Sequence, residues 1–225
     1  MQDKVRVLKI VFGQEISQEE IPLFRGAVIN SLESNDVLFH NHDGDGLRYS
    51  YPLIQYKRIG GKAAIVCAGD GTEAIGEFFA SGNFDIMLKN RQLHLEIESV
   101  KAYQSIVQIC EDVFEYQVRK WLPFNQDNFV DFQKLEGVVE RCCMLEKILT
   151  GNILSMAKGL GCHFEKQVEV KIKELGEPRG YIYKGVKMKG FDMAFKSDVS
   201  IPSYLGIGKG VSLGMGMLKR FNNEN

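Results

Sequence analysis

The order of strands and helices in this 225-residue chain predicts an α+β protein built from two tandem ferredoxin-like (RRM-like) domains. In the first half, hydrophobic periodicity and turn residues give the order strand, helix, strand, hairpin, strand, helix, strand, which is a split βαβ unit. The same order begins again near residue 114, and its second helix is reduced to a short turn. We therefore expect one domain over residues 1–110 and another over residues 111–225.

Turn residues bound the expected strands of the first half, and apolar residues three and four apart mark its helices. Ser17, followed by Glu19 and Glu20, is typical of a helix N-cap with an acidic first turn, and Thr72 precedes the second helix. Pro52 within a strand predicts that this strand lies at the edge of the sheet. The expected strands are 5–12, 47–56, 62–68 and 92–108, and the expected helices are 18–33 and 73–80.

One apolar stripe dominates the second half and predicts a single long helix over residues 126–159, which the glycines at 159 and 161 end. The remaining expected elements are strands at 114–123, 164–172 and 181–195, a short helical turn around 202–205, and a last strand after a glycine-rich stretch.

The charge of the chain is small overall and uneven along its length. A formal net charge of −1 argues against a protein that coats nucleic acid by charge alone. Residues 157–225 nevertheless contain 12 Lys and Arg against 7 Asp and Glu, so the C-terminal part is the basic part. A local basic groove remains compatible with this distribution.

Cysteine usage and the N-terminal residues indicate a reduced, cytoplasmic protein. The five cysteines form no CxxC pair, which argues against a structural zinc site. The first residues lack the apolar run of a signal peptide, and no stretch reaches the length of a membrane span. We expect no membrane association, no cofactor and no resident metal.

The stretch 206–216 has five glycines, one lysine and one serine. A glycine-rich backbone can turn with positive φ, and its N–H groups can form a concavity that attracts phosphates. The spacing fits neither a P-loop nor a dinucleotide fingerprint, and a glycine-rich hairpin end is the alternative interpretation. The residues predicted to bind a phosphate backbone here are Gly206, Gly208, Lys209, Gly210, Ser212, Gly214 and Gly216.

Two histidines lie together in a polar segment after the first helix. His40 and His42 are two residues apart, so in an extended chain their imidazoles point the same way. Such a pair can act as general acid and general base near neutral pH. The alternatives are two surface histidines, or a metal site with Asp43 and Asp45 close by.

Lysines also gather on the strand expected at 181–195. Lys184, Lys187 and Lys189 lie close together and could line a groove for nucleic acid, with Lys187 and Lys189 as the stronger candidates. The alternative is an exposed strand face that simply carries charge.

These motifs resemble one known family. The pattern Gly-apolar-Gly, five residues including Lys209, then Gly-apolar-Gly near the C-terminus is similar to the glycine-rich loop of the RAMP superfamily. Phe39-His40-Asn41-His42 followed by Tyr49 resembles the CRISPR-associated endoribonucleases with paired histidines that cut precursor CRISPR RNA within its repeats. The strand Leu47–Leu53 is similar to the strand that follows the histidine in these enzymes.

The resemblance implies a metal-independent transesterification. The ribose 2′-OH attacks the neighbouring phosphate while His40 and His42 act as acid and base, which yields a 2′,3′-cyclic (or 3′) phosphate and a 5′-OH. Tyr49 is expected to contact the phosphate or the ribose. Many relatives supply a lysine near the histidines, whereas residues 27–38 contain no Lys or Arg, and Arg48 is the nearest substitute.

The resemblance also implies partners. The expected RNA partner is CRISPR repeat RNA, that is precursor crRNA. The expected protein partners are subunits of a CRISPR effector complex. A homodimer is also possible, because relatives include monomers and dimers. Two alternatives to the enzyme remain: a non-cutting RNA-binding RAMP subunit, and a ferredoxin-like module that binds a small molecule.

Overall fold

The computed structural model describes residues 4–32, 42–43, 46–47 and 51–221. Contacts divide the chain into two compact units. The N-terminal unit consists of residues 2–105 together with 212–214, and the C-terminal unit consists of residues 106–211 and 215–225.

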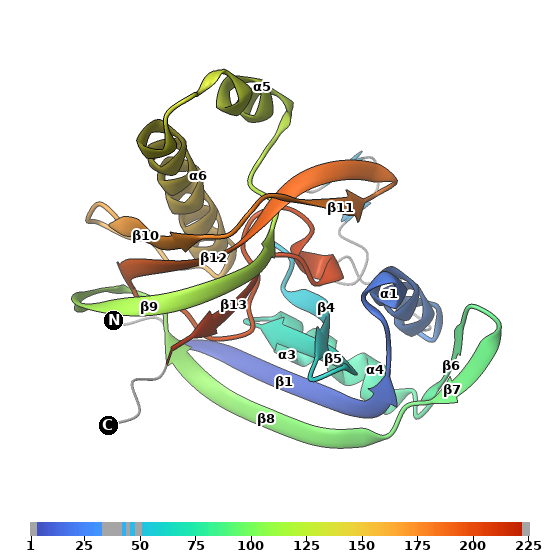
Figure 1. Ribbon diagram of the computed structural model, residues 1–225. Helices are drawn as coiled ribbons and strands as arrows, with labels where there is room; N and C mark the ends of the chain where they lie inside the picture. The colour runs from blue at the N-terminus through green and yellow to red at the C-terminus, as the bar shows by residue number, and fades with distance from the viewer. Residues whose placement is uncertain (1–3, 33–41, 44–45, 48–50, 222–225) are drawn as a thin grey trace. The chain divides into compact units, whose positions relative to one another are not determined.

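The N-terminal unit is built on a four-stranded antiparallel sheet with the order β4-β5-β1-β8 (Figure 1). Its strands are β1 (Lys4–Glu15), β4 (Ile54–Ile59), β5 (Lys62–Ala68) and β8 (Ile97–Ile106). This is the strand order of a ferredoxin-like fold, which the sequence predicted. β4 lies at the sheet edge as expected, and Pro52 precedes the strand instead of interrupting it.

The first helix begins where the sequence predicted. Ser17 is the N-cap of a 3-10 turn, η1 (Gln18–Glu20), which continues into α1 (Ile21–Asn30). Glu20 accepts a hydrogen bond from the Ser17 backbone N–H at 2.8 Å, which completes a capping box. That hydrogen bond is the largest cause that lowers the pKa of the Glu20 carboxyl, and Arg91 adds to it.

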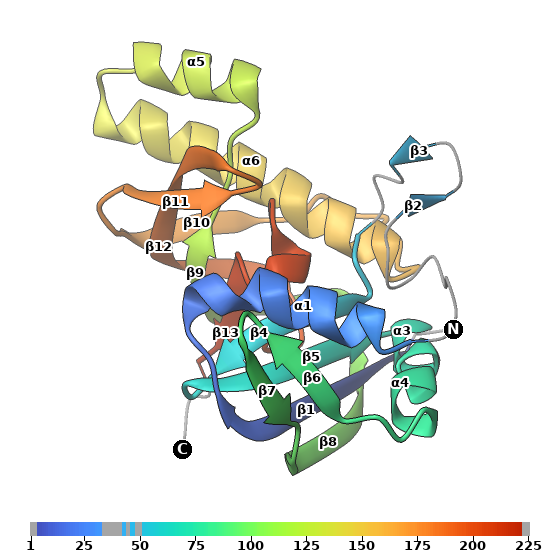
Figure 2. The ribbon, with the colours of Figure 1, turned by 90° about the vertical axis from the view of Figure 1, so that its right-hand side faces the viewer.

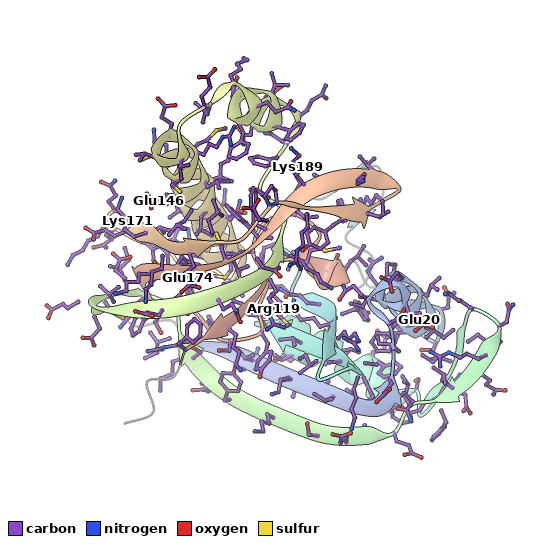
Figure 3. All side chains as sticks on the ribbon, in the orientation of Figure 1. Glu20, Arg119, Glu146, Lys171, Glu174 and Lys189 are labelled. Carbon is purple, nitrogen blue, oxygen red and sulfur yellow. The ribbon has the colours of Figure 1, made fainter. Side chains whose placement is uncertain are left out.

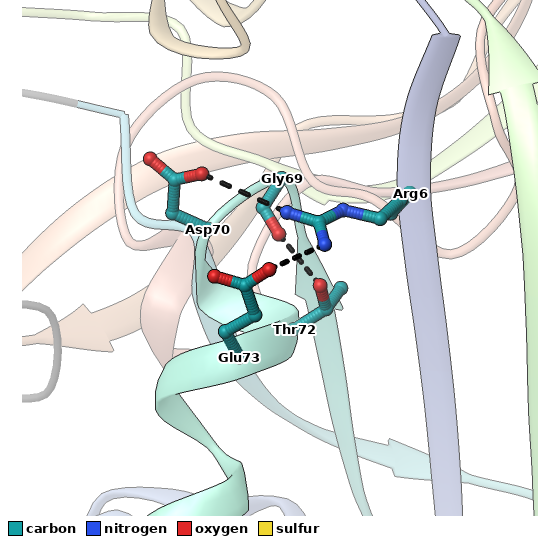
Figure 4. A network of polar contacts seen from close by, with 5 residues as sticks. All are labelled: Arg6, Gly69, Asp70, Thr72 and Glu73. Carbon is teal, nitrogen blue, oxygen red and sulfur yellow. Dashed lines mark hydrogen bonds and ion pairs between the residues drawn. The ribbon is translucent and has the colours of Figure 1, made fainter.

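The second helix consists of two short pieces, α3 (Gly71–Ala74) and α4 (Gly76–Ala80). Asp70, not Thr72, stands at the N-cap. The Thr72 hydroxyl instead donates to the Gly69 carbonyl at 2.7 Å (Figure 4). Arg6 of β1 contacts Glu73 at 2.5 Å, so this short helix is tied to the sheet.

One face of the sheet carries the core of the N-terminal unit. Phe12, Phe24 and Tyr56 are fully buried, and their rings meet edge to face at centroid distances of 6.0 and 5.8 Å. Phe78 of α4 joins the same cluster, so α1 and α4 cover the same face (Figure 2). Burial of aromatic side chains of this size supplies much of the stability of a small unit.

The strand expected at 92–108 is interrupted. β6 (Asp85–Leu88) and β7 (Arg91–His94) form a separate two-stranded hairpin, and only β8 joins the main sheet. Ile86 and Leu88 of the hairpin pack into the core, which explains why a second ribbon forms before β8 begins.

The C-terminal unit repeats the topology with the strand order β10-β12-β9-β13, and β11 pairs with β12. Its strands are β9 (Ile109–Trp121), β10 (Val170–Leu175), β11 (Arg179–Tyr183), β12 (Val186–Val199) and β13 (Met217–Arg220). The single strand expected at 181–195 is therefore a hairpin. It turns at Lys184 and Gly185, which have φ values of 50° and 78°.

The helix expected over 126–159 is two helices, α5 (Gln126–Lys134) and α6 (Val138–Gly159). Leu135 is extended and Gly137 is the N-cap of α6, so the chain reverses between them. α5 runs back beside α6 in Figures 1 and 2. Glu146 fixes α6 to β10: it accepts hydrogen bonds from the Ile172 backbone N–H and the Lys171 ammonium, both at 3.0 Å (Figure 3).

The second helix of the C-terminal unit is reduced, as the sequence predicted. Between β12 and β13 the chain forms the glycine-rich stretch, whose only regular helical piece among the described residues is the 3-10 turn η2 (Val211–Leu213). The turn expected around 202–205 is non-helical. No helix in the described part of the chain is both long and apolar enough to span a bilayer.

Gly216 is predicted to be essential for packing. Its φ is 62°, and a Cβ there would lie 1.9 Å from the Ile207 carbonyl oxygen. Gly161, the matched control, has a φ of 77° and nothing within 4 Å of such a Cβ. We expect Gly161→Ala to lower the free energy of unfolding by about 1–2 kcal/mol through backbone strain alone.

Gly216→Ala should cost roughly 1–3 kcal/mol more, because the backbone must also move. Denaturant unfolding of the two variants measures the difference. An equal loss of free energy of unfolding in the two variants would mean that the backbone around Gly216 moves to admit the Cβ at no energetic cost.

Candidate functional site

The predicted catalytic residues fall mostly in segments that the structure does not describe. His40, Arg48 and Tyr49 lie outside the described residues. The backbone of His42 belongs to β2 (His42–Asp43), which pairs with β3 (Gly46–Leu47), and His42 stands opposite Leu47. The catalytic assignment of these four residues therefore stays a prediction.

The other two histidines are exposed, one in each unit. His94 of β7 lies 3.0 Å from the Asp85 carboxylate across the hairpin, with both side chains more than half exposed. His163 is exposed in the segment that follows α6.

The C-terminal unit contains a pocket of about 680 Å³, and three of the predicted RNA-binding side chains line it. Lys187 and Lys189 come from β12, and Lys209 comes from the glycine-rich stretch. The remaining lining residues belong to the start of α5 and to the β11–β12 hairpin: Phe124, Asn125, Gln126, Phe129, Pro178, Arg179, Gly180, Val186 and Met188.

Aromatic packing holds the start of α5 in place. The ring of buried Phe124 lies 4.7 Å from Phe132 and 5.6 Å from Phe129, and Phe191 of β12 closes the cluster. Asn125 is the N-cap of α5, and its side-chain oxygen accepts the Asn128 backbone N–H at 2.7 Å. One wall of the pocket is therefore fixed by packing and by a helix cap.

The three lysines have exposed side chains that are available to a ligand. Lys189 extends from β12 toward the segment that leads into α5 (Figure 3), and its Nζ lies 5.6 Å from the centroid of the Phe129 ring. Within the described part of the chain, Lys187, Lys189 and Lys209 have no carboxylate within 4.0 Å. Arg179, by contrast, lies 4.0 Å from Asp192.

Gly180 makes room for Lys187. A Cβ at position 180 would lie 2.5 Å from the Lys187 Cε, because the lysine stem crosses the glycine. In the β11–β12 hairpin Gly180 pairs with Lys189 and Ile182 pairs with Lys187, so Gly180 and Lys187 are diagonal neighbours. The glycine thus determines where the Lys187 ammonium sits in the pocket.

Lys209 is positioned by close packing of the glycine-rich stretch against the end of β9. Gly208 has a φ of 84°, and a Cβ there would lie 2.9 Å from the ring of Trp121. The Lys209 backbone N–H donates to the Leu122 carbonyl at 3.2 Å. Trp121 is itself fully buried and donates to Asn152 of α6 at 2.9 Å.

The glycine-rich stretch is less amide-lined than the sequence suggested. Four of its backbone N–H groups donate to protein carbonyls, those of Ile207, Lys209, Met215 and Gly216. Positive φ at Gly208, Gly210, Gly214 and Gly216 explains why glycine is required at these positions. Residues 212–214, which include Ser212 and Gly214, group with the N-terminal unit. RNA contacts by these glycines and by Ser212 stay a prediction.

Among the described residues, no group of three or more His, Cys, Asp or Glu side chains is placed to hold a metal ion, and all five cysteines are free.

Lys57 of β4 is a different kind of lysine. It is fully buried, and its Nζ has no hydrogen-bond partner among the described residues. Burial alone lowers the pKa of Lys57 from its ordinary 10.5 to about 7.

The tandem ferredoxin-like units, with a glycine-rich stretch in place of the last helix, define a protein of the RAMP type. Two family models match nearly the whole chain: the Cas6b N-terminal domain over residues 3–105 and the Cas6b C-terminal domain over residues 108–221. The chain belongs to the Cas6b family. The resemblance to CRISPR-associated RAMP proteins that the sequence indicated is thereby confirmed.

Individual relatives agree with this family. An uncharacterised protein of Methanocaldococcus jannaschii is 34% identical over 146 residues, which are 60% of this chain and 97% of the relative. A crystal structure of Cas6b is 26% identical, with a TM-score of 0.89 over 97% of this chain and 100% of that chain.

A CRISPR RNA processing endoribonuclease Cas6b has the same fold at 24% identity, with a TM-score of 0.75 over 97% of this chain and 100% of that one. Csf5, a type IV Cas6 crRNA endonuclease, shares the fold at 13% identity with a TM-score of 0.57, over 98% and 100% of the two chains.

Sequence reasoning found the lysines of the pocket and missed its aromatic wall. Phe124 comes just before Asn125, the N-cap of α5, and Phe129 lies within that helix. The capping residue is the one local sequence signal that a helix begins at this wall of the pocket. Arg179 had no local signal beyond its place in a Pro-Arg-Gly turn.

Lys57 should give the protein a pH-dependent stability. The unfolded chain keeps this proton up to about pH 10.5, whereas the folded protein releases it near pH 7. Between these values the unfolded state binds more protons, so the free energy of unfolding rises with pH, by up to about 1.4 kcal/mol per pH unit.

Lys57→Met should lose this rise and be more stable than the wild type at pH 7 and below. Denaturant unfolding at a series of pH values measures the difference, and Lys101→Met on exposed β8 is the matched control. A Lys57→Met profile parallel to that of the wild type would show that the amine finds a compensating partner.

Proposed function

We propose that this protein is an endoribonuclease that cleaves CRISPR repeat RNA without a metal ion. The observation that carries the proposal is the match of Cas6b family models to both units. One of its structural neighbours is named as a CRISPR RNA processing endoribonuclease Cas6b. The N-terminal match includes His40 and His42, and the C-terminal match includes the three pocket lysines.

The proposed reaction needs only groups that the chain itself supplies. The 2′-oxygen attacks the adjacent phosphorus and loses its proton to one imidazole, while the bond from phosphorus to the 5′-oxygen breaks. The other imidazole gives its proton to that 5′-oxygen. The products are a 2′,3′-cyclic phosphate, which can open to a 3′-phosphate, and a 5′-OH. Which of His40 and His42 is the base stays open.

Negative charge grows on the phosphate in the transition state and needs a donor or a cation beside it. We assign this role to Arg48, with Tyr49 as a hydrogen-bond donor to the phosphate or the ribose. Residues 27–38 contain no Lys or Arg, and this departure favours the second candidate function, an RNA-binding subunit that does not cut.

RNA binding is assigned to the C-terminal unit. Lys187, Lys189 and Lys209 surround one pocket and have no carboxylate within 4.0 Å among the residues that the structure describes, which suits a phosphate backbone. Repeat RNA is the proposed partner. An effector complex and a homodimer stay predictions from the resemblance, and a cytoplasmic location stays a prediction from the cysteines and the N-terminal residues.

The direct test is cleavage of repeat RNA from the same genome in the presence of EDTA. We expect single-turnover cleavage by the wild-type protein and a loss of about 10²-fold or more in His40→Ala and in His42→Ala. Because one imidazole must be neutral and the other protonated, the rate should fall on both sides of the imidazole pKa range. His163→Ala, which changes an exposed histidine of the other unit, is the matched control.

A 2′-deoxy substitution at the cut site removes the nucleophile and should abolish cleavage without affecting binding. Cleavage that survives this substitution, or that requires a divalent cation, would contradict the mechanism. Tight binding without cleavage would favour the non-cutting RNA-binding subunit. Absence of any RNA binding would favour the third alternative, a ferredoxin-like module that binds a small molecule.

A further inference from the structure

We propose that the pocket between the start of α5 and the β11–β12 hairpin holds one unpaired nucleotide of the RNA, with its base against Phe129 and its phosphate between the lysines. The inference rests on the proposed function in one respect only, namely that the ligand is RNA. It assigns Phe124, Phe129, Lys187 and Lys189 to a nucleotide site in the C-terminal unit.

The volume of the pocket suits a single nucleotide. It is about 680 Å³, within the usual range for small-molecule sites, roughly 300–1,000 Å³. A base within a duplex is stacked and paired, so only an unpaired base can enter.

The aromatic wall gives the base a partner. Phe129 is partly exposed at the pocket, and Phe124 is buried behind it with their ring centroids 5.6 Å apart. The second ring fixes the orientation of the first, because Phe124 also packs on Phe132 and Phe191. An aromatic ring that is held from behind can stack on any base, since every base has a π-face.

The cations lie beside that wall. Lys189 Nζ lies over the Phe129 ring, 5.6 Å from its centroid. The flexible lysine stem can move aside for a base on that face while its ammonium stays within reach of the phosphate of the same nucleotide. Lys187 lies across Gly180, and Lys209 enters from the glycine-rich stretch. None of the three has a carboxylate within 4.0 Å in the described segments, so a phosphate would not have to displace an ion pair.

Two amide side chains complete the lining. Gln126 and Asn125 are exposed at the start of α5. The Asn125 oxygen accepts the helix-cap hydrogen bond, so its NH2 group is the polar part left to donate to a ligand. Amides offer donors and acceptors that match the edges of bases. The combination of ring, amide and ammonium groups favours a nucleotide over a free phosphate or an acidic peptide, which need no aromatic wall.

The first experiment measures RNA binding at equilibrium, by fluorescence anisotropy of a labelled single-stranded repeat RNA. Phe129→Leu keeps an apolar side chain and removes the π-face, and it should raise the Kd for the RNA by about 5- to 100-fold. Lys189→Gln should weaken binding and reduce the slope of log K against log salt by about 0.7. Phe221→Leu and Lys158→Gln, at exposed positions of the same unit outside the pocket, should leave both quantities unchanged.

The second experiment locates the nucleotide. RNAs with a single abasic position, moved along the repeat, should bind the wild-type protein more weakly at one position. Phe129→Leu should bind that RNA and the intact RNA equally well, because the lost base and the lost ring belong to one contact. Gly180→Ala, which displaces the Lys187 stem and removes no side chain, should also weaken binding. Gly180→Ala replaces Phe129→Leu as the test of the pocket if Phe129→Leu lowers the thermal stability.

The outcomes separate this inference from the proposed function. One outcome is that the effect of the abasic position depends on Phe129 while the protein binds RNA without cutting it. This outcome supports the nucleotide pocket and overturns the proposed nuclease activity. Normal cleavage, with Kd unchanged in Phe129→Leu, Lys189→Gln and Gly180→Ala, overturns the pocket alone. Absence of RNA binding by the wild-type protein overturns both.

Discussion

The close approach of the glycine-rich stretch to the end of β9 is the contact on which the rest of the C-terminal unit depends. A Cβ at Gly208 would lie 2.9 Å from the ring of Trp121, and the Gly216 N–H donates to the Lys120 carbonyl at 3.1 Å. Two residues beyond Leu122, which accepts the Lys209 N–H, Phe124 begins the aromatic wall. One short run at the end of β9 therefore holds Lys209 on one side and starts α5 on the other. The pocket inherits its geometry from this run, because both walls are anchored to it.

Solvation explains why lysines have opposite roles in the two units. The three pocket lysines keep their ammonium groups in water, so their charge costs little and remains available for a phosphate. Lys57 has lost its water and has gained no partner within the described segments, so burial disfavours its charged form. The formal net charge of −1 averages over such differences. The local placement of a few uncompensated cations therefore says more about RNA binding than the overall charge of the chain.

The sequence predicted the strand order of both units because each strand has its own apolar pattern and turn residues. It did not predict the break between α5 and α6, since the apolar stripe continues from Phe132 through Leu135 and only the extended backbone at Leu135 reveals the turn. The β11–β12 hairpin was read as one strand because Lys184 adopts a positive φ that lysine rarely has. Lys187 and Lys189 could be predicted because they lie close together on one expected strand. Their meeting with Phe129 depends on how α5 folds back, which no local pattern records.

The glycine-rich stretch takes the place of a helix in the chain order and also buries apolar side chains as that helix would. In the N-terminal unit the connection between β5 and β8 contains α4, which buries Phe78 in the core. In the C-terminal unit the corresponding connection buries Ile207, Val211 and Met215. A chain that must bury apolar side chains without helical hydrogen bonds has to satisfy its backbone in other ways, and here its N–H groups donate to carbonyls of β9 and of the stretch itself. Only glycine permits such tight turns, so the glycine content follows from packing. Because four of its backbone amides are used in this way and the Lys209 side chain is exposed, Lys209 is the part of the stretch best placed to meet a phosphate.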